Sequence, residues 1–438
     1  MTDHRTVEKY LVRSGFAPRP VEPEEPARKY RAAVVIPTLG EFSHLPNTLR
    51  SLAENSTESL AEIMVLAVIN NSDAAETDMI ADNQRTLAAL RKLVPEFCGG
   101  LIPGENLFWI DASSPGREIS RNGGVGEARK IGMDQALTHL DFRKKPLLFC
   151  LDADTLVRKD YLTETFNYFS ANPNITAAVV RFEHRFSDIP EETGAIITYE
   201  LFMHYYIFGL RLAGSPYACH ALGSATVCTA DAYVKAGGMR PRNAGEDFYF
   251  IQAALKTGAV GEVTGTRVFP SCRPSSRVPF GTGPRIRAIL AGQELLFYHP
   301  DVFAELGKMF SIVNNAKNIA EFESLPALFK QQLSVIAWNF LAIENNFESA
   351  WLKIFRNTRK DIPSLLQAFH VWFDAFKTLK FIHYCENTAP AFARLPAMEA
   401  FSKLCFNYKI NIPFECLSDQ LQLLEYLRET NIFAAEKN

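Results

Sequence analysis

Three uninterrupted apolar runs constrain the fold of this chain more than any other feature. They lie at residues 32–36 (AAVVI), within residues 62–73 (EIMVLAVINNSD) and within residues 146–157 (PLLFCLDADTLV). Such short, β-branched runs are typical of strands that are buried on both faces. We expect Pro37 to end the first run, helices near residues 45–55, 81–93 and 127–139, and a further strand at 107–110. This strand–helix–strand order indicates a mainly parallel α/β sheet flanked by helices.

The chain of 438 residues has room for two to three domains. Residues 1–30 are rich in proline and charge, and we expect an N-terminal arm without a packed core there. Residues 31–283 hold the α/β pattern. Residues 284–438 change to Leu, Phe and Ala at helical spacing and predict a helical C-terminal region. Most of its aromatic residues should be core, and any surplus leaves open a self-association surface or a role in selecting an acceptor.

Composition narrows the class of function. The 46 basic and 49 acidic residues give a formal charge of −3, which argues against nucleic acid as the partner. None of the eight cysteines forms a C-x-x-C pair, so a zinc ribbon has no support and a reduced, cytoplasmic protein is expected. The N-terminus lacks the apolar segment of a secretory signal.

The segment at residues 194–214 is long enough to span a bilayer. Glu200, His204 and Arg211 interrupt it, so a buried or interfacial helix is expected, with peripheral membrane contact left open.

Two acidic pairs are candidates for chemistry. Asp152 and Asp154 follow the third apolar run, at the strand end where ligands bind in open α/β sheets. If the strand continued, both carboxylates would share one face and would suit Mg²⁺ or Mn²⁺. The alternative is a solvated strand end. Glu246 and Asp247 begin a predicted helix, where acidic residues are also favoured by the helix dipole, but a general base is the functional interpretation.

Two basic or glycine-rich segments could contact phosphate. Residues 123–132 (GGVGEARKIG) place glycines and Arg129 at a helix start, although the spacing fits neither a P-loop nor a dinucleotide fingerprint. Residues 270–287 form a basic segment in which Arg273 or Arg277 could contact a diphosphate. A solvated linker explains that segment equally well.

Taken in order, five motifs resemble the family-two glycosyltransferases, which have the GT-A fold. The resemblance covers residues 32–268 and rests on VVIPTLGE, INNSD, GVGEARKIGMDQAL, LLFCLDADTLV and AGGMRPRNAGEDFYFIQAALKTG. It implies a GT-A nucleotide-sugar-binding mixed sheet and a hexosyltransferase that moves a sugar from a nucleotide-diphosphate donor to a hydroxyl acceptor. The acceptor, whether a glycan, a lipid or a small molecule, stays open, and so does a homo-oligomer.

The resemblance also implies roles for individual residues. Asp247, with Glu246 beside it, would be the catalytic base of an inverting reaction. Asp154 would ligate Mn²⁺ or Mg²⁺, and Asp152 would face the ribose or the metal. The remaining donor-site residues would be Pro37, Thr38, Glu41, Asn71, Asp73, Arg129, Gly223 and Ser224, with Arg273 and Arg277 from the basic segment.

The chain departs from the family pattern in two places. Asn-Asn-Ser follows the second strand where the family often has Asp-Gly-Ser, and VFPSCRPS lacks the late histidine that many of these enzymes use as a metal ligand. A retaining transferase, a nucleotidyltransferase and a non-catalytic nucleotide-sugar-binding protein remain the alternatives. The nucleotidyltransferase would need a glycine-rich phosphate loop after the first strand, and PTLGEFSH is not one.

Overall fold

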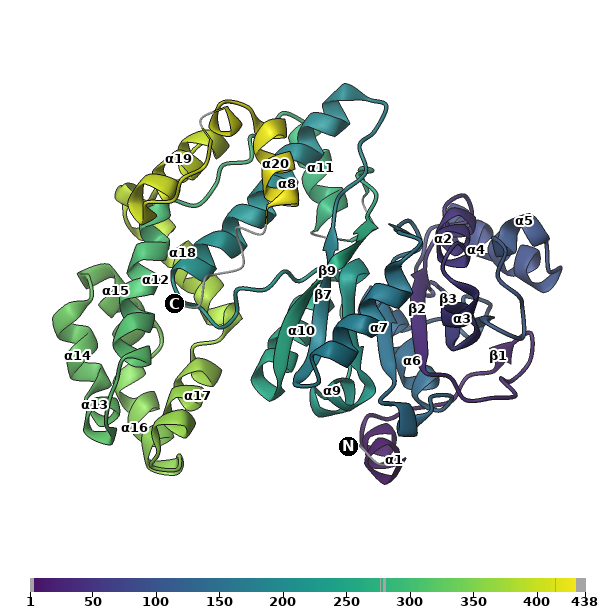
Figure 1. Ribbon diagram of the computed structural model, residues 1–438, viewed down its shortest axis with the longest axis horizontal. Helices are drawn as coiled ribbons and strands as arrows, with labels where there is room; N and C mark the ends of the chain where they lie inside the picture. Colours follow the sequence, from purple (N-terminus) through teal and green to yellow (C-terminus); the bar gives the residue numbers. More distant parts are fainter. Residues whose placement is uncertain (1–3, 276, 279–280, 414, 431–438) are drawn as a thin grey trace. The chain divides into compact units, whose positions relative to one another are not determined.

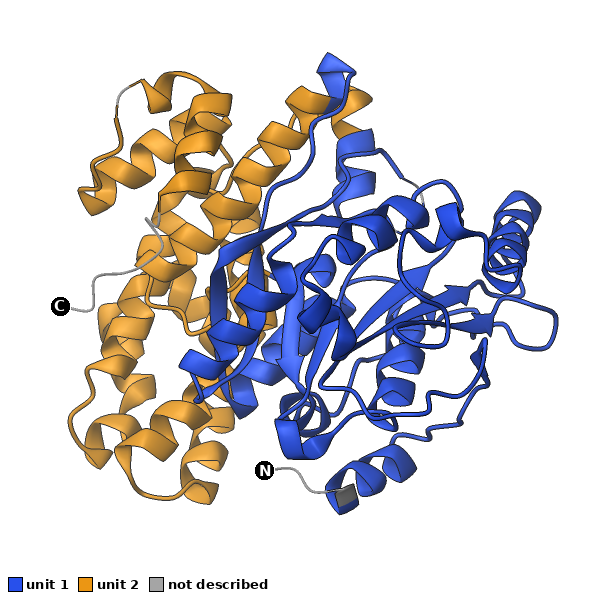
Figure 2. Ribbon diagram, turned by 45° about the vertical axis from the view of Figure 1, so that its right-hand side comes forward, with its two compact units in different colours: residues 1–192, 221–287 blue, residues 193–220, 288–438 orange. Residues whose placement is uncertain are grey.

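The computed structural model describes residues 4–275, 277–278, 281–413 and 415–430. The chain divides into two compact units, shown in Figure 2. Unit 1 comprises Met1–Glu192 and Ala221–Arg287, and unit 2 comprises Thr193–His220 and Ala288–Asn438.

This division does not follow the expected boundaries at residues 30 and 283. The helical unit is discontinuous in sequence, because residues 193–220 belong to it although they lie within the expected α/β segment. The N-terminal arm is also not separate: helix α1 (His4–Arg13) buries Val7 and Tyr10 in the core of unit 1. The Tyr10 hydroxyl donates a 2.8 Å hydrogen bond to Asp134 of helix α6 (Gly124–Leu137). The proline-rich composition did not predict this helix, which follows its own amphipathic spacing.

Unit 1 is built on one nine-stranded mixed sheet in the order β1-β4-β3-β2-β5-β8-β7-β9-β6. Strands β2 to β5 pair in parallel in the order β4-β3-β2-β5, while β8 is antiparallel to both β5 and β7. The strands are β1 Val21–Glu22, β2 Ala32–Thr38, β3 Ile63–Asn70, β4 Leu107–Ala112, β5 Leu147–Cys150, β6 Leu156–Val157, β7 Ile175–Phe182, β8 Thr226–Thr229 and β9 Ala259–Phe269.

The predicted parallel strands are confirmed, with one difference at Pro37. Every residue of β2 and β3 is buried, as their unbroken apolar runs indicate. Strand β2 continues through Pro37 to Thr38, and Pro37 lies opposite Val68 of β3. Proline removes one N–H from the ladder, but pairing on either side of it carries the strand to the buried Thr38.

Helices cover the sheet of unit 1 (Figure 1). Helix α6 packs on β2 and β3, where Gly132 lies so close to Val35 and Val68 that a Cβ would collide with both side chains. Helix α7 (Tyr161–Ala171) lies against Phe149 through Tyr161 and Phe166. The further helices of this unit are α2 Leu45–Ala53, α3 Thr57–Ala61, α4 Thr77–Arg91, α5 Pro95–Cys98, α7 Tyr161–Ala171, α9 Ala230–Lys235 and α10 Glu246–Thr257, with 3-10 turns Phe142–Lys144 and Gly223–Ala225.

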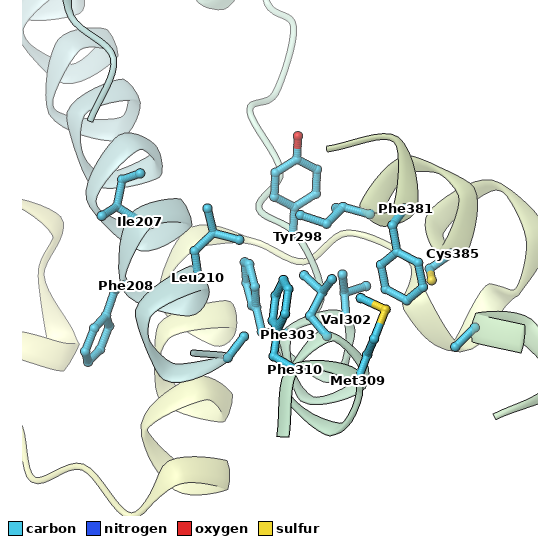
Figure 3. Packing of buried hydrophobic residues seen from close by; sticks show 14 of the residues in the cluster. Ile207, Phe208, Leu210, Tyr298, Val302, Phe303, Met309, Phe310, Phe381 and Cys385 are labelled. Carbon is cyan, nitrogen blue, oxygen red and sulfur yellow. The ribbon is translucent and has the colours of Figure 1, made fainter. Parts of the chain in front are cut away.

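Unit 2 is helical and has its own core. Helix α8 (Pro190–Leu212) contributes Phe208 and Leu210, and helix α12 (Pro300–Asn314) contributes Phe303 and Phe310 (Figure 3). Leu201 and Tyr205 of α8 are buried in the same core. The other helical segments are α13 Ile319–Glu323, α14 Leu325–Gln332, α15 Val335–Asn339, the π-helical turn Phe340–Glu344, α16 Phe347–Asn357, α17 Ile362–Trp372, α18 Ala375–Thr388, Pro390–Phe392, α19 Ala397–Tyr408, Cys416–Ser418 and α20 Gln420–Glu429. Helix α11 (Thr282–Leu290) spans the division at Arg287, and most of its residues belong to unit 1.

The predicted burial of the aromatic residues in unit 2 is largely confirmed. Phe340, Trp351, Phe355 and Phe369 are buried, while Phe376 is 39% exposed. Glu200, one of the three polar residues that interrupt α8, is fully buried and accepts two hydrogen bonds of 2.7 and 2.9 Å from Arg428 of α20. In the described ranges, no helix combines the length and the apolar content needed to cross a bilayer.

Candidate active site

The candidate site lies at the carboxyl ends of the parallel strands of unit 1. Strands β2, β3 and β5 end at Thr38, Asn70 and Cys150, and their pairing places these ends side by side. The loops that follow carry Glu41, Asn71, Asp73, Asp152 and Asp154. Ligands bind at this edge in open α/β sheets.

A buried asparagine network joins the ends of β2 and β3. Asn70 accepts a 3.2 Å hydrogen bond from the Thr38 N–H. The Asn83 side chain, from α4, donates to the Asn70 carbonyl and to Asn71 Oδ1, each at 2.9 Å, and accepts from the Gly40 N–H. Asn71 Oδ1 also accepts from the Ser113 hydroxyl. The network therefore holds the loop after β2 in place.

Arg129 lies at the centre of the acidic residues. Its side chain is 4% exposed, with one terminal nitrogen on Asp152 and the other on Glu246. Helix α6 supplies Arg129, the turn after β5 supplies Asp152, and the first turn of α10 supplies Glu246. A single guanidinium therefore joins the two acidic motifs that the sequence singled out.

Asp247 is held beside this cluster by backbone donors. Its carboxylate accepts a 2.7 Å hydrogen bond from the Phe248 N–H and a further one from the Gly223 N–H. A Cβ on Gly223 would overlap the guanidinium of Arg129, so a larger residue there would displace this arginine. Asp247 is half-buried, whereas Glu246 is 3% exposed. Asp247 is therefore the member of this pair that solvent, or an acceptor, reaches more readily.

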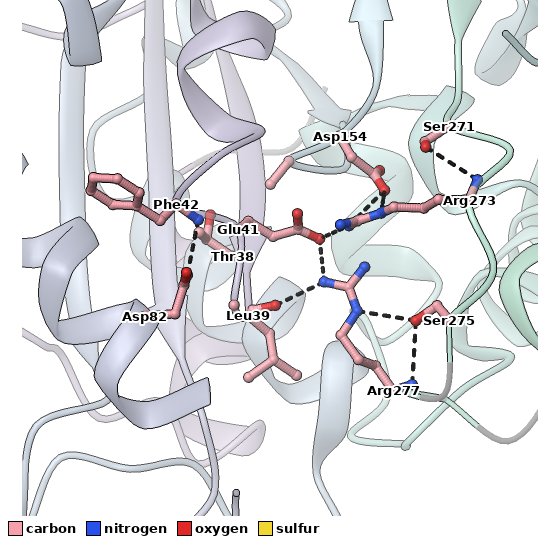
Figure 4. Close-up of polar contacts among 12 residues, drawn as sticks. Thr38, Leu39, Glu41, Phe42, Asp82, Asp154, Ser271, Arg273, Ser275 and Arg277 are labelled. Carbon is pink, nitrogen blue, oxygen red and sulfur yellow. Dashed lines mark hydrogen bonds and ion pairs between the residues drawn. The ribbon is translucent and has the colours of Figure 1, made fainter. Parts of the chain in front are cut away.

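Two further arginines, Arg273 and Arg277, bind the acids Asp154 and Glu41, as Figure 4 shows. Arg273 donates to Asp154 Oδ2 at 2.9 Å from Nε and also binds Glu41 Oε1. Arg277 binds the same Glu41 oxygen and donates a 2.8 Å hydrogen bond to the Leu39 carbonyl. The second oxygen, Glu41 Oε2, is buried and accepts no hydrogen bond from any described residue.

Burial shifts the acids of the site toward their neutral forms. It raises the pKa of Glu246 to about 7 and raises the pKa of Asp247, although the attraction of Arg129 opposes both shifts. Burial likewise raises the pKa of Glu41 against the attraction of Arg277 and Arg273. Raised carboxyl pKa values are typical of general acid–base residues that work near neutral pH.

The structure brings together most, but not all, of the predicted donor-site residues. Pro37, Thr38 and Ser224 are buried at the strand ends, whereas Asp73 is exposed in the loop after β3. The strand β5 ends at Cys150, so Asp152 and Asp154 lie in a turn closed by a 3.1 Å hydrogen bond from the Thr155 N–H to the Asp152 carbonyl. The two carboxylates therefore do not share one strand face; each has a different arginine.

The glycines before Arg129 serve packing in this structure. The Gly126 N–H donates a 3.0 Å hydrogen bond to the Arg242 carbonyl, and a Cβ on Gly124 would collide with Asn243. These N–H and Cα positions face the loop before α10, which corrects the interpretation of residues 123–132 as a phosphate-cradling loop.

Sequence reasoning missed two residues at the site. Asn83 accepts a hydrogen bond from Gly40 and so fixes the loop after β2. No sequence motif marks an asparagine inside a helix as a site residue. His44 lies near Asp154 and Arg273, and burial lowers its pKa, followed by the repulsion of Arg273. The sequence signal that could have identified His44 is its place in the loop between β2 and α2, at the carboxyl end of a buried strand.

Comparison with known proteins gives structural similarity only. No protein-family model matches the chain, and no curated protein sequence is similar to it. The structure of S. aureus TarS 1–349 in complex with UDP-GlcNAc is similar with a TM-score of 0.39 at 13% identity, over 82% of this chain and 91% of that chain. TarS 1–349 in complex with UDP gives 0.39 at 12% identity, over 78% and 91%. The mannosyltransferase PcManGT from Pyrobaculum calidifontis, in complex with GDP-Man and Mn²⁺, gives 0.37 at 14% identity, over 99% and 96%. Similarity this distant assigns no role to a residue of this chain.

Proposed function

We propose that this chain is a glycosyltransferase that moves a sugar from a nucleoside-diphosphate sugar to a hydroxyl acceptor, with inversion at the anomeric carbon. The observation that carries the proposal is the convergence of two acidic pairs at one sheet edge. Arg129 joins Asp152, on the donor side, to Glu246, next to the half-buried Asp247. Such a site has positively charged side chains that can bind a diphosphate and a carboxylate that can accept the proton of a hydroxyl.

Each residue then has a chemical task. Asp247 accepts the proton of the acceptor hydroxyl while that oxygen forms the new bond to the anomeric carbon. The bond from that carbon to the diphosphate oxygen breaks, and the diphosphate leaves with the electron pair. Arg273 and Arg277 supply positive charge where that negative charge develops, which lowers the barrier.

The oxygen ligands at this edge suit a hard divalent cation. Across the described residues, no three Asp, Glu, His or Cys side chains gather as a complete metal site. Mg²⁺ and Mn²⁺ commonly use one or two carboxylates together with substrate phosphate and water. Asp154 and Glu41 both contact Arg273, and Glu41 Oε2 has no hydrogen-bond partner among the described residues, so one buried carboxylate oxygen is available here to a cation. We propose that Asp154 would hold the metal ion, with Asp152 nearby, and that a bound ion would supply positive charge to the diphosphate.

The function is tested with a panel of UDP- and GDP-sugars that includes UDP-GlcNAc and GDP-mannose. Thermal stability and nucleoside diphosphate release are measured with Mn²⁺, with Mg²⁺ and with EDTA. We expect at least one donor to raise the unfolding midpoint, since a ligand of the folded state stabilises it, and to be hydrolysed slowly. Asp247→Asn should keep donor binding and lose turnover. If no sugar nucleotide binds or is hydrolysed, the proposal is wrong.

Asp154→Asn tests the metal ligand separately. The variant should stay folded, because Asp154 is partly exposed and Arg273 keeps its contact with Glu41. It should lose the difference in donor affinity between Mn²⁺ and EDTA, measured by calorimetry. Asp231→Asn, on the surface of α9, is the matched control. An unchanged Mn²⁺ effect in folded Asp154→Asn would remove Asp154 from the metal site and leave the transferase proposal standing.

A further inference from the structure

We infer that Arg129 is a positioning residue that fixes the donor-side acid, Asp152, relative to the acid pair Glu246–Asp247, and is not itself a ligand of the nucleotide. The inference rests on the proposed function and deepens it. It also departs from the expectation that Arg129 contacts the base or the diphosphate.

The first support is the direction of the guanidinium. Both terminal nitrogens already bind carboxylates, and the side chain is 4% exposed. The remaining nitrogen, Nε, is buried and has no hydrogen-bond partner among the described residues. A diphosphate would therefore have to displace Asp152 or Glu246 to reach this arginine.

The second support is the rigidity of its mounting. Arg129 lies in the middle of α6, and Gly132, one turn further on, lets that helix approach β2 and β3 closely. The Gly126 N–H ties the start of α6 to Arg242, just before α10. The helix that carries Arg129 is thus fixed both to the sheet that ends near Asp152 and to the loop that leads to Glu246.

The third support is Gly223. Its Cα lies against the guanidinium, and its N–H donates to the carboxylate of Asp247. The turn at Gly223 therefore contacts Arg129 and also donates a hydrogen bond to the proposed base, Asp247. A displacement of Arg129 would shift Asp247 through Gly223 as well as through Glu246.

Arginine, rather than any cation, is required for this task. A guanidinium is planar and presents its donors as a fixed fork, so it can bind two carboxylates in defined directions. A lysine ammonium would restore the positive charge but would bind as a point charge. This difference separates positioning from simple charge balance.

The experiment compares Arg129→Lys, Arg129→Met, Glu246→Gln and the double variant Arg129→Met/Glu246→Gln. The matched control is Arg31→Met. Arg31 binds Glu62 at 2.9 Å beside the amino ends of β2 and β3, away from the candidate site. The assay is hydrolysis of whichever panel donor the wild type turns over, with kcat and KM determined separately, together with thermal unfolding of every variant.

We expect Arg129→Lys to unfold close to the wild type and yet lose kcat by at least about 100-fold, in the range found when a positioned catalytic group is misplaced. The losses in kcat for Arg129→Met and Glu246→Gln should be non-additive, so that the double variant is no slower than Arg129→Met alone. Arg31→Met should keep its turnover. Recovery of kcat in Arg129→Lys, or additive losses, would overturn the inference. A loss confined to KM would show that Arg129 binds the nucleotide directly.

The bridge itself is measured without turnover. Double-variant cycles on the unfolding midpoint, Arg129→Met with Asp152→Asn and Arg129→Met with Glu246→Gln, should both show coupling larger than the cycle of Arg31→Met with Glu62→Gln. Absence of coupling to either acid overturns the bridge. If the wild type turns over no donor while both cycles show coupling, the proposed function fails and the bridge stands as a structural one.

Discussion

At the scale of single residues, Asp152 and Asp154 differ in partner and exposure although only one residue separates them. The Asp152 side chain is 38% exposed and binds Arg129, while that of Asp154 is 18% exposed and binds Arg273. The strand end turns between them, so one acid is tied to the helix α6 and the other to the basic segment after β9. Asp152→Asn and Asp154→Asn should therefore have different effects. The first should disturb the position of α10, and the second should weaken cation binding.

The raised pKa of Glu246 predicts a pH-dependent stability. Its folded-state value of about 7 lies above the ordinary value of 4.5, so its contribution is complete below about pH 4 and is lost as the pH rises through 7. The free energy of unfolding of the wild type should therefore fall, relative to Glu246→Gln, by up to about 3 kcal/mol between pH 5 and pH 8. Urea unfolding at several pH values measures this. A constant difference between the two proteins would contradict the assignment of the raised pKa to Glu246.

Sequence reasoning located the reactive residue types but not their partners. The local sequence pattern places acidic residues at a strand end and at a helix start. It therefore predicted Asp152, Asp154, Glu246 and Asp247 as candidate site residues. The bridge through Arg129 depends on how α6 lies over the sheet, and no spacing along the chain contains that information. The same holds for Asn83, whose hydrogen bonds all go to residues of other elements.

At the scale of elements, the parallel strands β2, β3 and β5 were predictable, and the mixed part of the sheet formed by β8, β7, β9 and β6 was not. Strands β2, β3 and β5 are buried on both faces and have unbroken apolar sequences. Strand β9 has a mixed burial pattern and the two-residue β6 pairs with its end, so neither gives a periodic signal. Pairing order also depends on contacts far apart in sequence, which periodicity does not report.

Two glycines of helix α8 allow the same substitution, glycine to alanine, to test how closely α8 packs against α12. A Cβ on Gly209 would collide with the ring of Phe303 in α12, whereas a Cβ on Gly194 meets nothing within 4 Å. Gly209→Ala should destabilise unit 2 by about 1–3 kcal/mol through overpacking. Gly194→Ala should be neutral or stabilise by about 0.5–1 kcal/mol, because alanine is the better helix former. Urea unfolding compares them.

Relief of the collision supplies the second control. Gly209→Ala combined with Phe303→Leu should be less damaging than the sum of the two single changes, because leucine leaves room for the new methyl group. Equal stability of Gly209→Ala and Gly194→Ala would show that α8 and α12 are not in close contact.

At the scale of the whole molecule, the two units interleave along the chain, and this sets where it can be cut. Residues 193–220 belong to unit 2, and Leu201, Tyr205 and Phe208 are buried in its core. A protein truncated after Arg287 would keep these apolar side chains without their partners. We expect it to aggregate, since a large exposed apolar surface favours association.

A second truncated protein should behave differently. It also ends at Arg287, but a Gly/Ser linker joins Glu192 to Ala221 in place of residues 193–220. This protein should remain in solution as a folded unit 1, as judged by size-exclusion chromatography and circular dichroism. Equal solubility of both truncated proteins would contradict the assignment of α8 to the core of unit 2.

The same interleaving affects synthesis on the ribosome. Domains generally form in order from the N-terminus as the chain emerges. Helix α8 emerges in the middle of the α/β unit, yet Phe303 and Phe310, which cover it, follow only after residues 213–299 have been made. During that interval its aromatic face lacks the partners of its final core. Until α12 has emerged, this apolar surface is exposed, and exposed apolar surface on an incompletely folded chain favours aggregation.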